Sequence, residues 1–584
     1  MKNKLIFLTF LLIFIFSLGI TLPLASFTVQ ESDGGEFATA SVIEALVHPP
    51  GYPIYMEIAK ILVDIFPNNP YHTLASFSGV CVSFATGLLF LIGILITKNY
   101  FLSFSASITW LLYEPTLRNS ADAEVFGLHQ VFVCVLVLAC IYLYRAKDKI
   151  VLKTLLVGFV SGLGASHHHA IVLWAPLVIC SIVYQGNKKS IRLSFLLLLI
   201  SLFSALAGLF PYLFLFAYKT PFAYAPIESF YELVLYMFRA DYGTFSMRPG
   251  ISDTDVSYLP KFLKFSINYI PFFIISFLLL ILKFIKEKSI IVLGVICSVI
   301  LHFWLAYNLK LPDNDVLFLE FTMRFFGAIA LSLAISFLWV FYNLQIKNIN
   351  KNLFALIILL PTVVYLPKSL EASNARLDRI TNIELEQIIK EVPKNSVFFS
   401  SLDRIAMGLG FKQYVENKRP DIIHIVSSLY GNKKYNKSLN IKYPNLGIDF
   451  ETTNFKNLIK FFDENNIKIF SYYETRELDT HKKIPIGLVW QWIKKEIPDN
   501  TNLYIYNILR FCANYPQELL SVSKHREHSN YIVDYLFFDI INVLKKNLKD
   551  QNLILEIKAI QKSIKKKNII DVKQKCSRLS QKVF

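Results

Sequence analysis

The chain has 584 residues, 54% of them hydrophobic, and carries a formal net charge of +17. Its apolar residues come in long blocks, which excludes an ordinary water-soluble domain and indicates a protein of the lipid bilayer. Residues 1–367 contribute +5 of the charge and residues 368–584 contribute +12. We therefore interpret the basic excess as a solvated surface, or as one that meets anionic lipid or an acidic partner, and expect no nucleic acid.

The apolar blocks predict eleven membrane spans, because about 20 consecutive apolar residues cross a bilayer. The first block, residues 5–26, fits either a signal peptide or a first spanning helix. The other ten lie near residues 72–97, 100–117, 127–145, 151–167, 168–185, 193–217, 264–283, 289–309, 322–343 and 353–367. The spans at 151–167 and 168–185 are expected to form a tight hairpin. The fold class is therefore an α-helical polytopic membrane protein.

Charges near the span ends predict the orientation, because Lys and Arg are retained on the cytoplasmic side. With the N-terminus inside, every cytoplasmic turn holds at least one Lys, and of the acids before residue 367 only Asp148 and Glu287 share that side. Residues 27–71, 219–263 and everything from about 368 onward then lie outside. We expect a multi-pass protein of the cell (cytoplasmic) membrane, with its chemistry on the outer face.

The sequence changes character after residue 367. Residues 396–399 and 421–426 are short apolar runs between polar helical stretches, a pattern that predicts strands. We expect an extracytoplasmic α/β domain over residues 368–500. Residues 501–584 are rich in Lys and predict a helical C-terminal segment.

Two carboxylates, Asp33 and Glu36, lie in the first outward loop and are separated by Gly34 and Gly35. His48 and a turn with prolines at 49, 50 and 53 follow, and prolines stiffen the backbone. A carboxylate on a rigid loop at the bilayer surface suits sugar transfer from a lipid carrier, because it can accept the proton of the attacking hydroxyl. The alternative is a solvated helix end without a catalytic role.

A family resemblance rests on this loop. The run Asp33-Gly34-Gly35-Glu36-Phe37, followed by His48-Pro49-Pro50-Gly51-Tyr52-Pro53-Ile54-Tyr55, resembles the signature of the transmembrane protein 260-like protein O-mannosyltransferases. The family usually has Ser at the position of Gly34. Weaker similarity continues at residues 123–126, 166–169, 324–326 and 414–421.

The resemblance implies a GT-C-type membrane glycosyltransferase, with residues 1–367 as its transmembrane catalytic domain. Such an enzyme takes a sugar from a polyprenyl-phosphate donor, works outside the cytoplasm and inverts the anomeric carbon. The resemblance makes Asp33 the expected general base and Glu36 the second catalytic candidate.

Six more residues are candidates for binding the donor or the acceptor. A phosphate leaving group needs cations or hydrogen-bond donors, and guanidinium suits bidentate contact. The candidates are His48, Tyr52, Glu124, His168, Arg239 and Arg324, and Arg118 and Arg248 are further outward arginines.

Four of these candidates have a simpler interpretation. Arg324 could pair with Glu320, and Glu124 could form a structural ion pair with Arg118. His48 could cap the proline turn, and Arg239 could belong to a solvated loop.

The three consecutive histidines at 167–169 invite a metal-site interpretation. Consecutive residues of a helix or turn point in different directions, so they cannot all bind one ion without strain. We therefore expect no metal and no cofactor apart from the lipid-phosphate sugar donor.

The sequence thus predicts a glycosyltransferase that moves a mannose-like hexose to Ser or Thr of exported proteins. A lipid or surface glycan as acceptor would use the same base. A polyprenyl-lipid transporter or flippase would need broken helices, midplane charges and two related halves, which are not evident. A catalytically silent scaffold is a further alternative.

Overall fold

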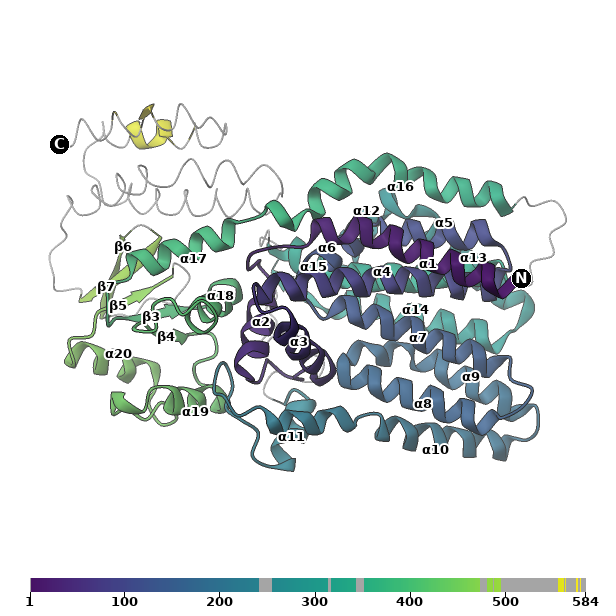
Figure 1. The fold of residues 1–584 in the computed structure, drawn as a ribbon, viewed down its shortest axis with the longest axis horizontal. Coiled ribbons are helices and arrows are strands. Elements are labelled where there is room, and N and C mark those ends of the chain that lie inside the picture. Colours follow the sequence, from purple (N-terminus) through teal and green to yellow (C-terminus); the bar gives the residue numbers. More distant parts are fainter. Residues whose placement is uncertain are drawn as a thin grey trace. The chain divides into compact units, whose positions relative to one another are not determined.

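The computed structural model describes residues 2–240, 255–312, 317–342, 351–472, 480–486, 488–494 and 555–560, and four single residues beyond these. The chain forms two compact units (Figure 1). The membrane unit comprises Met1–Phe27, Val47–Tyr218 and Ile227–Arg376. The C-terminal unit comprises Thr28–Leu46, Lys219–Pro226 and Leu377–Phe584. Two short segments from the first half of the chain therefore belong to the C-terminal unit.

The membrane unit is mostly helical, and its longest helices run roughly parallel to one another (Figure 1). In its first half these are α1 (Lys2–Thr21), η1 (Leu22–Leu24), α3 (Pro53–Ile65), α4 (Pro70–Thr97), α5 (Tyr100–Leu111), α6 (Glu114–Ala121), α7 (Phe126–Tyr144), α8 (Ile150–His167), η2 (His169–Trp174), α9 (Ala175–Asn187), α10 (Ile191–Ala207) and η3 (Phe210–Ala217). Then follow α11 (Phe230–Met237), α12 (Leu259–Tyr269), α13 (Pro271–Glu287), α14 (Ile290–Asn308), α15 (Leu317–Val340), α16 (Lys351–Ser373) and η4 (Ala375–Leu377). A two-stranded sheet pairs β1 (Asp255–Ser257) with β2 (Lys310–Pro312).

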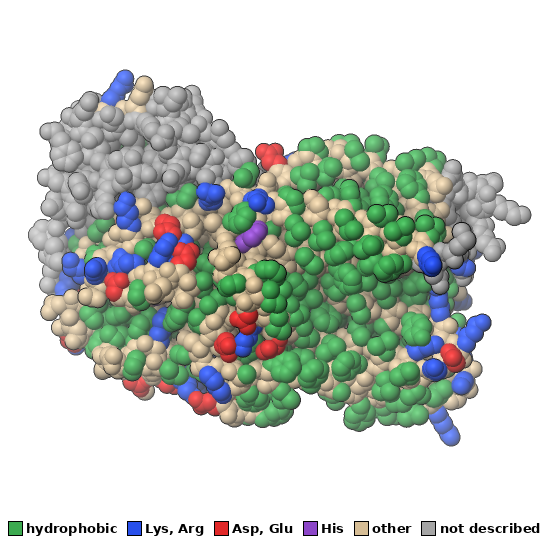
Figure 2. Space-filling view, viewed as in Figure 1, with side chains coloured by type: hydrophobic (Ala, Val, Ile, Leu, Met, Phe, Trp, Pro, Cys, Tyr) green, Lys and Arg blue, Asp and Glu red, His purple; other side chains and the backbone are tan. Residues whose placement is uncertain are grey.

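Nine helices among the described residues are long and apolar enough to cross a membrane. A tenth is added if α12 and α13, which are bent by 109°, count as one span. Large apolar side chains are exposed on the outer helices, among them Phe7 in α1, Phe203 in α10 and Leu282 in α13, and apolar atoms dominate the surface of this unit (Figure 2). Such a surface is rare on proteins in water and is suited to lipid. The chain is a multi-pass membrane protein, as the sequence predicts.

The structure differs from the eleven predicted spans at residues 100–117. Helix α5 ends at Leu111 and α6 starts separately at Glu114. The cause is Pro115, whose ring would clash with the carbonyl group of Leu111 in a continuous helix. The 12 residues of α5 extend about 18 Å at 1.5 Å per residue, less than the hydrocarbon core of a bilayer.

The span predicted at 264–283 is divided at Ile270 between α12 and α13. The other predicted spans are found as helices. The hairpin is present as two separate spans, Ile150–His167 and His169–Asn187, which are divided at the extended residue His168. The last span continues beyond residue 367 to Ser373, and the boundary between the two units follows Arg376.

The C-terminal unit contains a small α/β sheet. Its helices are α2 (Gly34–Ile43), α17 (Ile380–Glu391), α18 (Asp403–Tyr414), α19 (Lys433–Lys442), η5 (Pro444–Leu446) and α20 (Phe455–Glu464). Its strands are β3 (Val397–Ser400), β4 (Ile423–Val426), β5 (Ile469–Ser471), β6 (His481–Ile486) and β7 (Val489–Lys494), in the order β4-β3-β5-β7-β6. Strand β3 is parallel to both neighbours, whereas β7 is antiparallel to β5 and β6.

Strands β3 and β4 coincide with the two runs predicted to be strands. The helical segment predicted for residues 501–584 lies almost wholly outside the described residues.

Candidate active site

The two carboxylates of the first loop lie at the start of α2, in the C-terminal unit. Asp33 directly precedes the helix, and its carbonyl oxygen accepts hydrogen bonds from the amides of Glu36 (2.9 Å) and Phe37 (3.0 Å). The side chain of Asp33 is half-buried, whereas Glu36, one turn later, is buried. Asp33 is therefore the more accessible of the two carboxylates in the described structure.

The proline turn that follows lies in the membrane unit. Gly51 has a φ of +90°, and a Cβ atom there would come within 2.9 Å of Leu215 and 3.1 Å of Tyr236. Only glycine fits this backbone and this space without strain. His48 Nε2 and the Tyr52 hydroxyl share a hydrogen bond of 3.1 Å across the turn. His48 and Tyr52 are thus held together by a compact, closely packed turn.

His168, at the break between α8 and η2, is the centre of a cluster of rings. Its ring stacks on Tyr52 at a centroid distance of 5.9 Å and lies 5.5 Å from Phe126 and 4.9 Å from His129. The positive charge of Arg239 also acts on His168. The structure therefore brings His48, Tyr52, His168 and Arg239 of the predicted set to one region of the membrane unit.

The three consecutive histidines have different partners. His167 Nε2 bonds the carbonyl group of Val125 (3.0 Å), and His169 Nε2 bonds the hydroxyl group of Tyr212 (3.0 Å). His168 Nδ1 accepts the amide proton of Ala170 (3.1 Å). Among the residues that the structure describes, no group of three or more His, Cys, Asp or Glu side chains could hold a metal ion.

Glu124, just before α7, and Arg324, in the N-terminal third of α15, form an ion pair. Arg324 Nη1 lies 3.2 Å from Glu124 Oε1, and the two side chains are 15% and 4% exposed. The rings of Phe126 and Phe325 meet edge to face beside them at 5.3 Å. This pair connects two residues that the sequence singled out separately.

The sequence analysis offered Arg118 as an ion-pair partner of Glu124, and Glu320 as a partner of Arg324. Arg118 pairs at 2.9 Å with Glu114, which also accepts a hydrogen bond of 3.0 Å from Tyr269. The side chain of Glu320 lies outside the described residues, as does all of Arg248.

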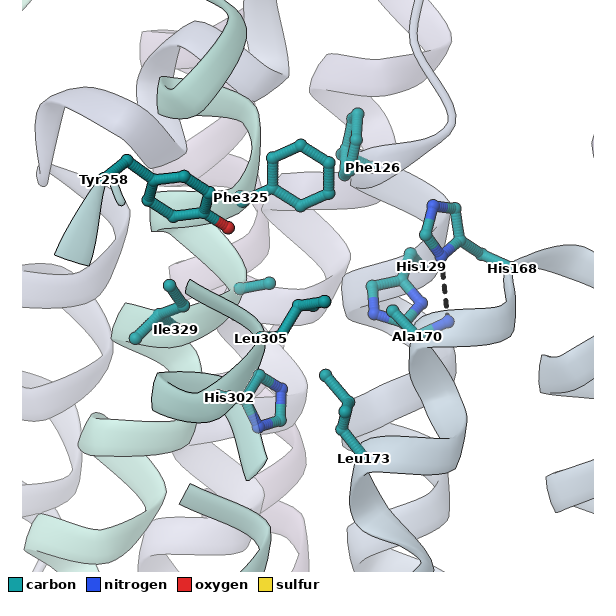
Figure 3. A pocket seen from close by; sticks show the side chains of 11 residues that line it. Phe126, His129, His168, Ala170, Leu173, Tyr258, His302, Leu305, Phe325 and Ile329 are labelled. Atoms are coloured by element: carbon teal, nitrogen blue, oxygen red, sulfur yellow. Dashed lines mark hydrogen bonds between the residues drawn. The ribbon is translucent and has the colours of Figure 1, made fainter. Parts of the chain in front are cut away.

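A pocket whose lining includes Phe126 and Phe325 lies within the membrane unit (Figure 3). Its cavity volume is about 20 Å³, room for about one water molecule. Its lining is mostly apolar but includes four polar rings, those of His129, His168, Tyr258 and His302. Both ring nitrogens of His129 and the hydroxyl of Tyr258 are buried and have no hydrogen-bond partner in the described part of the chain. Buried polar groups normally have partners, so a water molecule or a single polar group of a ligand would complete this pocket.

Three of these pocket residues were missed by the sequence analysis. His129 and His302 are single histidines inside apolar spans, and an ionisable residue within a span is a signal of function that was available. Tyr258 precedes α12 and carries no comparable signal, because tyrosines are common near membrane surfaces.

Comparisons with known proteins support the resemblance. Residues 33–192 match the family described as the N-terminal domain of protein O-mannosyl-transferase TMEM260. The chain is 24% identical over 423 residues to protein O-mannosyl-transferase TMEM260 of Mus musculus, an alignment that covers 67% of this chain and 58% of the mouse protein. It is 22% identical over 349 residues to the Dictyostelium discoideum protein of the same name, with 56% and 39% covered. The chain thus spans little more than half the length of its mouse relative.

Two solved structures have a similar fold. The apo oligosaccharyltransferase of Archaeoglobus fulgidus has a TM-score of 0.50 at 11% identity, covering 79% of this chain and 69% of that one. ArnT from Cupriavidus metallidurans, bound to undecaprenyl phosphate, has a TM-score of 0.51 at 9% identity, covering 84% and 99%. The resemblance to the TMEM260-like proteins and the GT-C-like fold class are both confirmed.

Proposed function

We propose that this chain is a membrane glycosyltransferase that moves a mannose-like hexose from a polyprenyl phosphate to Ser or Thr of an exported protein. The observation that carries the proposal is the family match over residues 33–192, which starts at the loop carboxylate Asp33 and contains five of the other candidates. The relatives named for protein O-mannosyl transfer, and the ArnT structure with its undecaprenyl phosphate, support the substrate classes.

In the proposed reaction Asp33 accepts the proton of the acceptor hydroxyl. The hydroxyl oxygen forms a bond to the anomeric carbon, while the bond from that carbon to the phosphate oxygen breaks and its electron pair leaves with the polyprenyl phosphate. A single displacement of this kind inverts the anomeric carbon. Asp33 is favoured over Glu36 as the base because it is the more accessible carboxylate, and a base must reach the proton that it accepts.

The donor is proposed to bind around His168 and the pocket beside it. The leaving phosphate gains negative charge, and Arg239 and Arg324 are cations suited to stabilise that charge. One hydroxyl group of the sugar is proposed to enter the pocket and bond to His129 or Tyr258, which have no hydrogen-bond partner among the described residues. We propose no metal or other cofactor for this step, so activity is expected to persist in EDTA.

We further propose that the N-terminus is cytoplasmic and the C-terminal unit extracytoplasmic. Lys and Arg gather at the end of the membrane unit where the N-terminus lies (Figures 1 and 2), as expected for a cytoplasmic face. A reporter enzyme fused after Asn374 should be active outside the cytoplasm. A cytoplasmic signal from that fusion would reverse the orientation.

The test is transfer from labelled polyprenyl-phosphate mannose to Ser- and Thr-containing peptides by the purified protein. Asp33→Asn keeps the size of the side chain and removes its basicity, so we expect a loss of at least about 100-fold in kcat, as is common for a lost general base. Asp64→Asn, at an exposed position of α3, is the matched control and should keep wild-type activity.

The outcomes separate the alternatives. Equal activity of Asp33→Asn and wild type would exclude Asp33 as the base. Transfer to a lipid or glycan but not to peptides would keep the base and change the acceptor. Movement of the lipid across vesicles without covalent transfer would replace the enzyme with a transporter.

A further inference from the structure

The loop that carries Asp33 is built into the C-terminal unit by contacts along its length. At its start, Thr28 Oγ1 and Gln30 Nε2 donate hydrogen bonds of 3.1 and 3.0 Å to the carbonyl oxygen of Asp378. At its end, Ala45 forms a bridge with Thr220 of the second inserted segment. The loop is therefore attached to this unit on both sides of Asp33, by side-chain hydrogen bonds before it and by a β-bridge after it.

The second inserted segment, Lys219–Pro226, is also attached to the C-terminal unit. The carbonyl oxygen of Phe222 accepts a hydrogen bond of 2.9 Å from Ser438, and the amide of Ala225 donates one of 3.0 Å to Lys434. The segment that supports the end of the Asp33 loop is thus itself held by α19.

Helix α2 packs directly on α18 (Figure 1). A Cβ atom on Gly35 would lie 3.2 Å from the carbonyl carbon of Met407 and 3.3 Å from the amide nitrogen of Gly408, so the two backbones meet closely. Helix α2 has 10 residues, and a helix of that length is marginal in water without tertiary contacts. Its helical state, and with it the geometry at Asp33, therefore depends on α18.

A buried arginine connects the loop to the sheet. Arg404, in the first turn of α18, lies 3.5 Å from Glu31 Oε1 and 3.1 Å from Glu384 Oε2, and the three side chains are at most 8% exposed. The Tyr472 hydroxyl lies 3.2 Å from Arg404 Nη2 and donates to Glu384 Oε1 at 2.9 Å. Burial alone would lower the pKa of the guanidinium, but Glu384, Tyr472 and Glu31 hold that pKa well above its usual value.

Arg404 and Tyr472 of this cluster lie just beyond the carboxyl ends of β3 and β5. Strand β3 leads through α18 to β4 on one side and has β5 on its other side, which makes it a switch point of the parallel strands. Open α/β sheets bind their ligands at the carboxyl ends of such strands. Here Arg404 follows β3 and Tyr472 follows β5, Tyr472 accepts a hydrogen bond from Arg404, and Arg404 faces Glu31 of the loop. At the carboxyl ends of these strands, where many α/β domains bind a ligand, this chain binds its own first loop.

We infer that the C-terminal unit holds the loop of Asp33 in its working conformation, and that Arg404, acting through Glu31, is a positioning residue for transfer. This inference rests on the proposed function, because it needs Asp33 to be the base. It gives the C-terminal unit a role in the reaction without any residue of its α/β sheet touching the substrate.

The test uses the full-length protein with Glu31→Gln. This variant removes the carboxylate that faces Arg404 and leaves the Arg404–Glu384 pair intact, so the unit is expected to fold. The control is Glu386→Gln, which breaks another ion pair of the same unit, with Lys412 at 2.8 Å. Hydrogen exchange of the amides of residues 34–43 reads the docking of α2 independently of activity, and kcat and the donor KM are measured in the same preparations.

For Glu31→Gln we expect exchange in α2 to be about tenfold faster and kcat to fall by about tenfold or more, in line with the loss of one ion-pair contact within a buried network. The donor KM should be almost unchanged, and Glu31→Asp, which keeps the charge, should recover part of kcat. Glu386→Gln should match the wild type in both measurements.

The experiments distinguish failure of this inference from failure of the proposed function. Wild-type exchange of α2 in Glu31→Gln would overturn the inference that this contact holds the loop. Faster exchange with unchanged kcat, while Asp33→Asn is inactive, would overturn the positioning role alone. Full activity of Asp33→Asn would instead refute the proposed base, whatever the exchange data show.

Discussion

The ion pair between Glu124 and Arg324 gives a prediction whose size can be worked from the structure. At 3.2 Å, two unit charges in surroundings with an effective dielectric constant of about 20 attract each other by about 5 kcal/mol. Removing one partner of a buried pair typically costs about 3–5 kcal/mol, because the other charge stays buried. Since Arg324 is 15% exposed, we expect Arg324→Met to cost about 3 kcal/mol, at the low end of that range.

A double-mutant cycle tests whether this cost belongs to the pair. In Arg324→Met/Glu124→Gln no charge is left behind, so the double variant should be more stable than the sum of the single changes by about 2 kcal/mol. The unfolding free energy of the four proteins is measured by SDS titration in mixed micelles. Glu464→Gln is the control: it breaks a pair with Lys460 in which the two side chains are 62% and 72% exposed, and should cost less than about 1 kcal/mol. Additive effects of the two single variants, to within about 0.5 kcal/mol, would refute the coupling.

Two further predictions concern single residues. Burial, with a smaller effect from the Lys442 charge, lowers the pKa of His424 to about 3, whereas the unfolded chain takes up this proton near pH 6.5. As the pH falls below about 6.5 the C-terminal unit should therefore lose up to about 1.4 kcal/mol of stability per pH unit, and His424→Asn should remove that slope in urea unfolding followed by pulse proteolysis. Tyr258→Phe should lower kcat/KM for the donor by about 5–10-fold, the size of one neutral hydrogen bond, without loss of stability. Tyr100→Phe, which also removes a buried partnerless hydroxyl but lies outside the pocket, should leave kcat/KM unchanged.

Much of the membrane unit could be predicted from the sequence because its signal is local. A run of apolar residues long enough to cross a bilayer identifies a span without knowledge of its neighbours. The span predicted at residues 100–117 was wrong because it was based on hydropathy alone. Pro115 within it is a local signal against a continuous helix.

The arrangement of the site was much less predictable, because it depends on contacts between distant residues. Glu124 and Arg324 are 200 positions apart, and the sequence offered each of them a nearer partner. The cluster of rings around His168 combines residues from three separate segments, the turn before α3, helix α7 and the break after α8. The pocket histidines His129 and His302 were not singled out, although each is an ionisable residue inside a span. The catalytic roles of Asp33 and Glu36 stay predictions, since they depend on family resemblance and on chemistry that the described structure does not test.

The attachment of the first loop to Asp378 also has a consequence for the order of events during synthesis. The hydrogen bond from Thr28 joins residues 350 positions apart. At about 5–20 residues per second, a ribosome needs roughly 20–70 s to make that stretch, so the loop leaves the ribosome long before its partner exists. Until then Glu31 has no Arg404 to meet, and α2 has no α18 to pack on. The loop is therefore completed late, and a chain that stops early lacks the surface on which its first carboxylates are held.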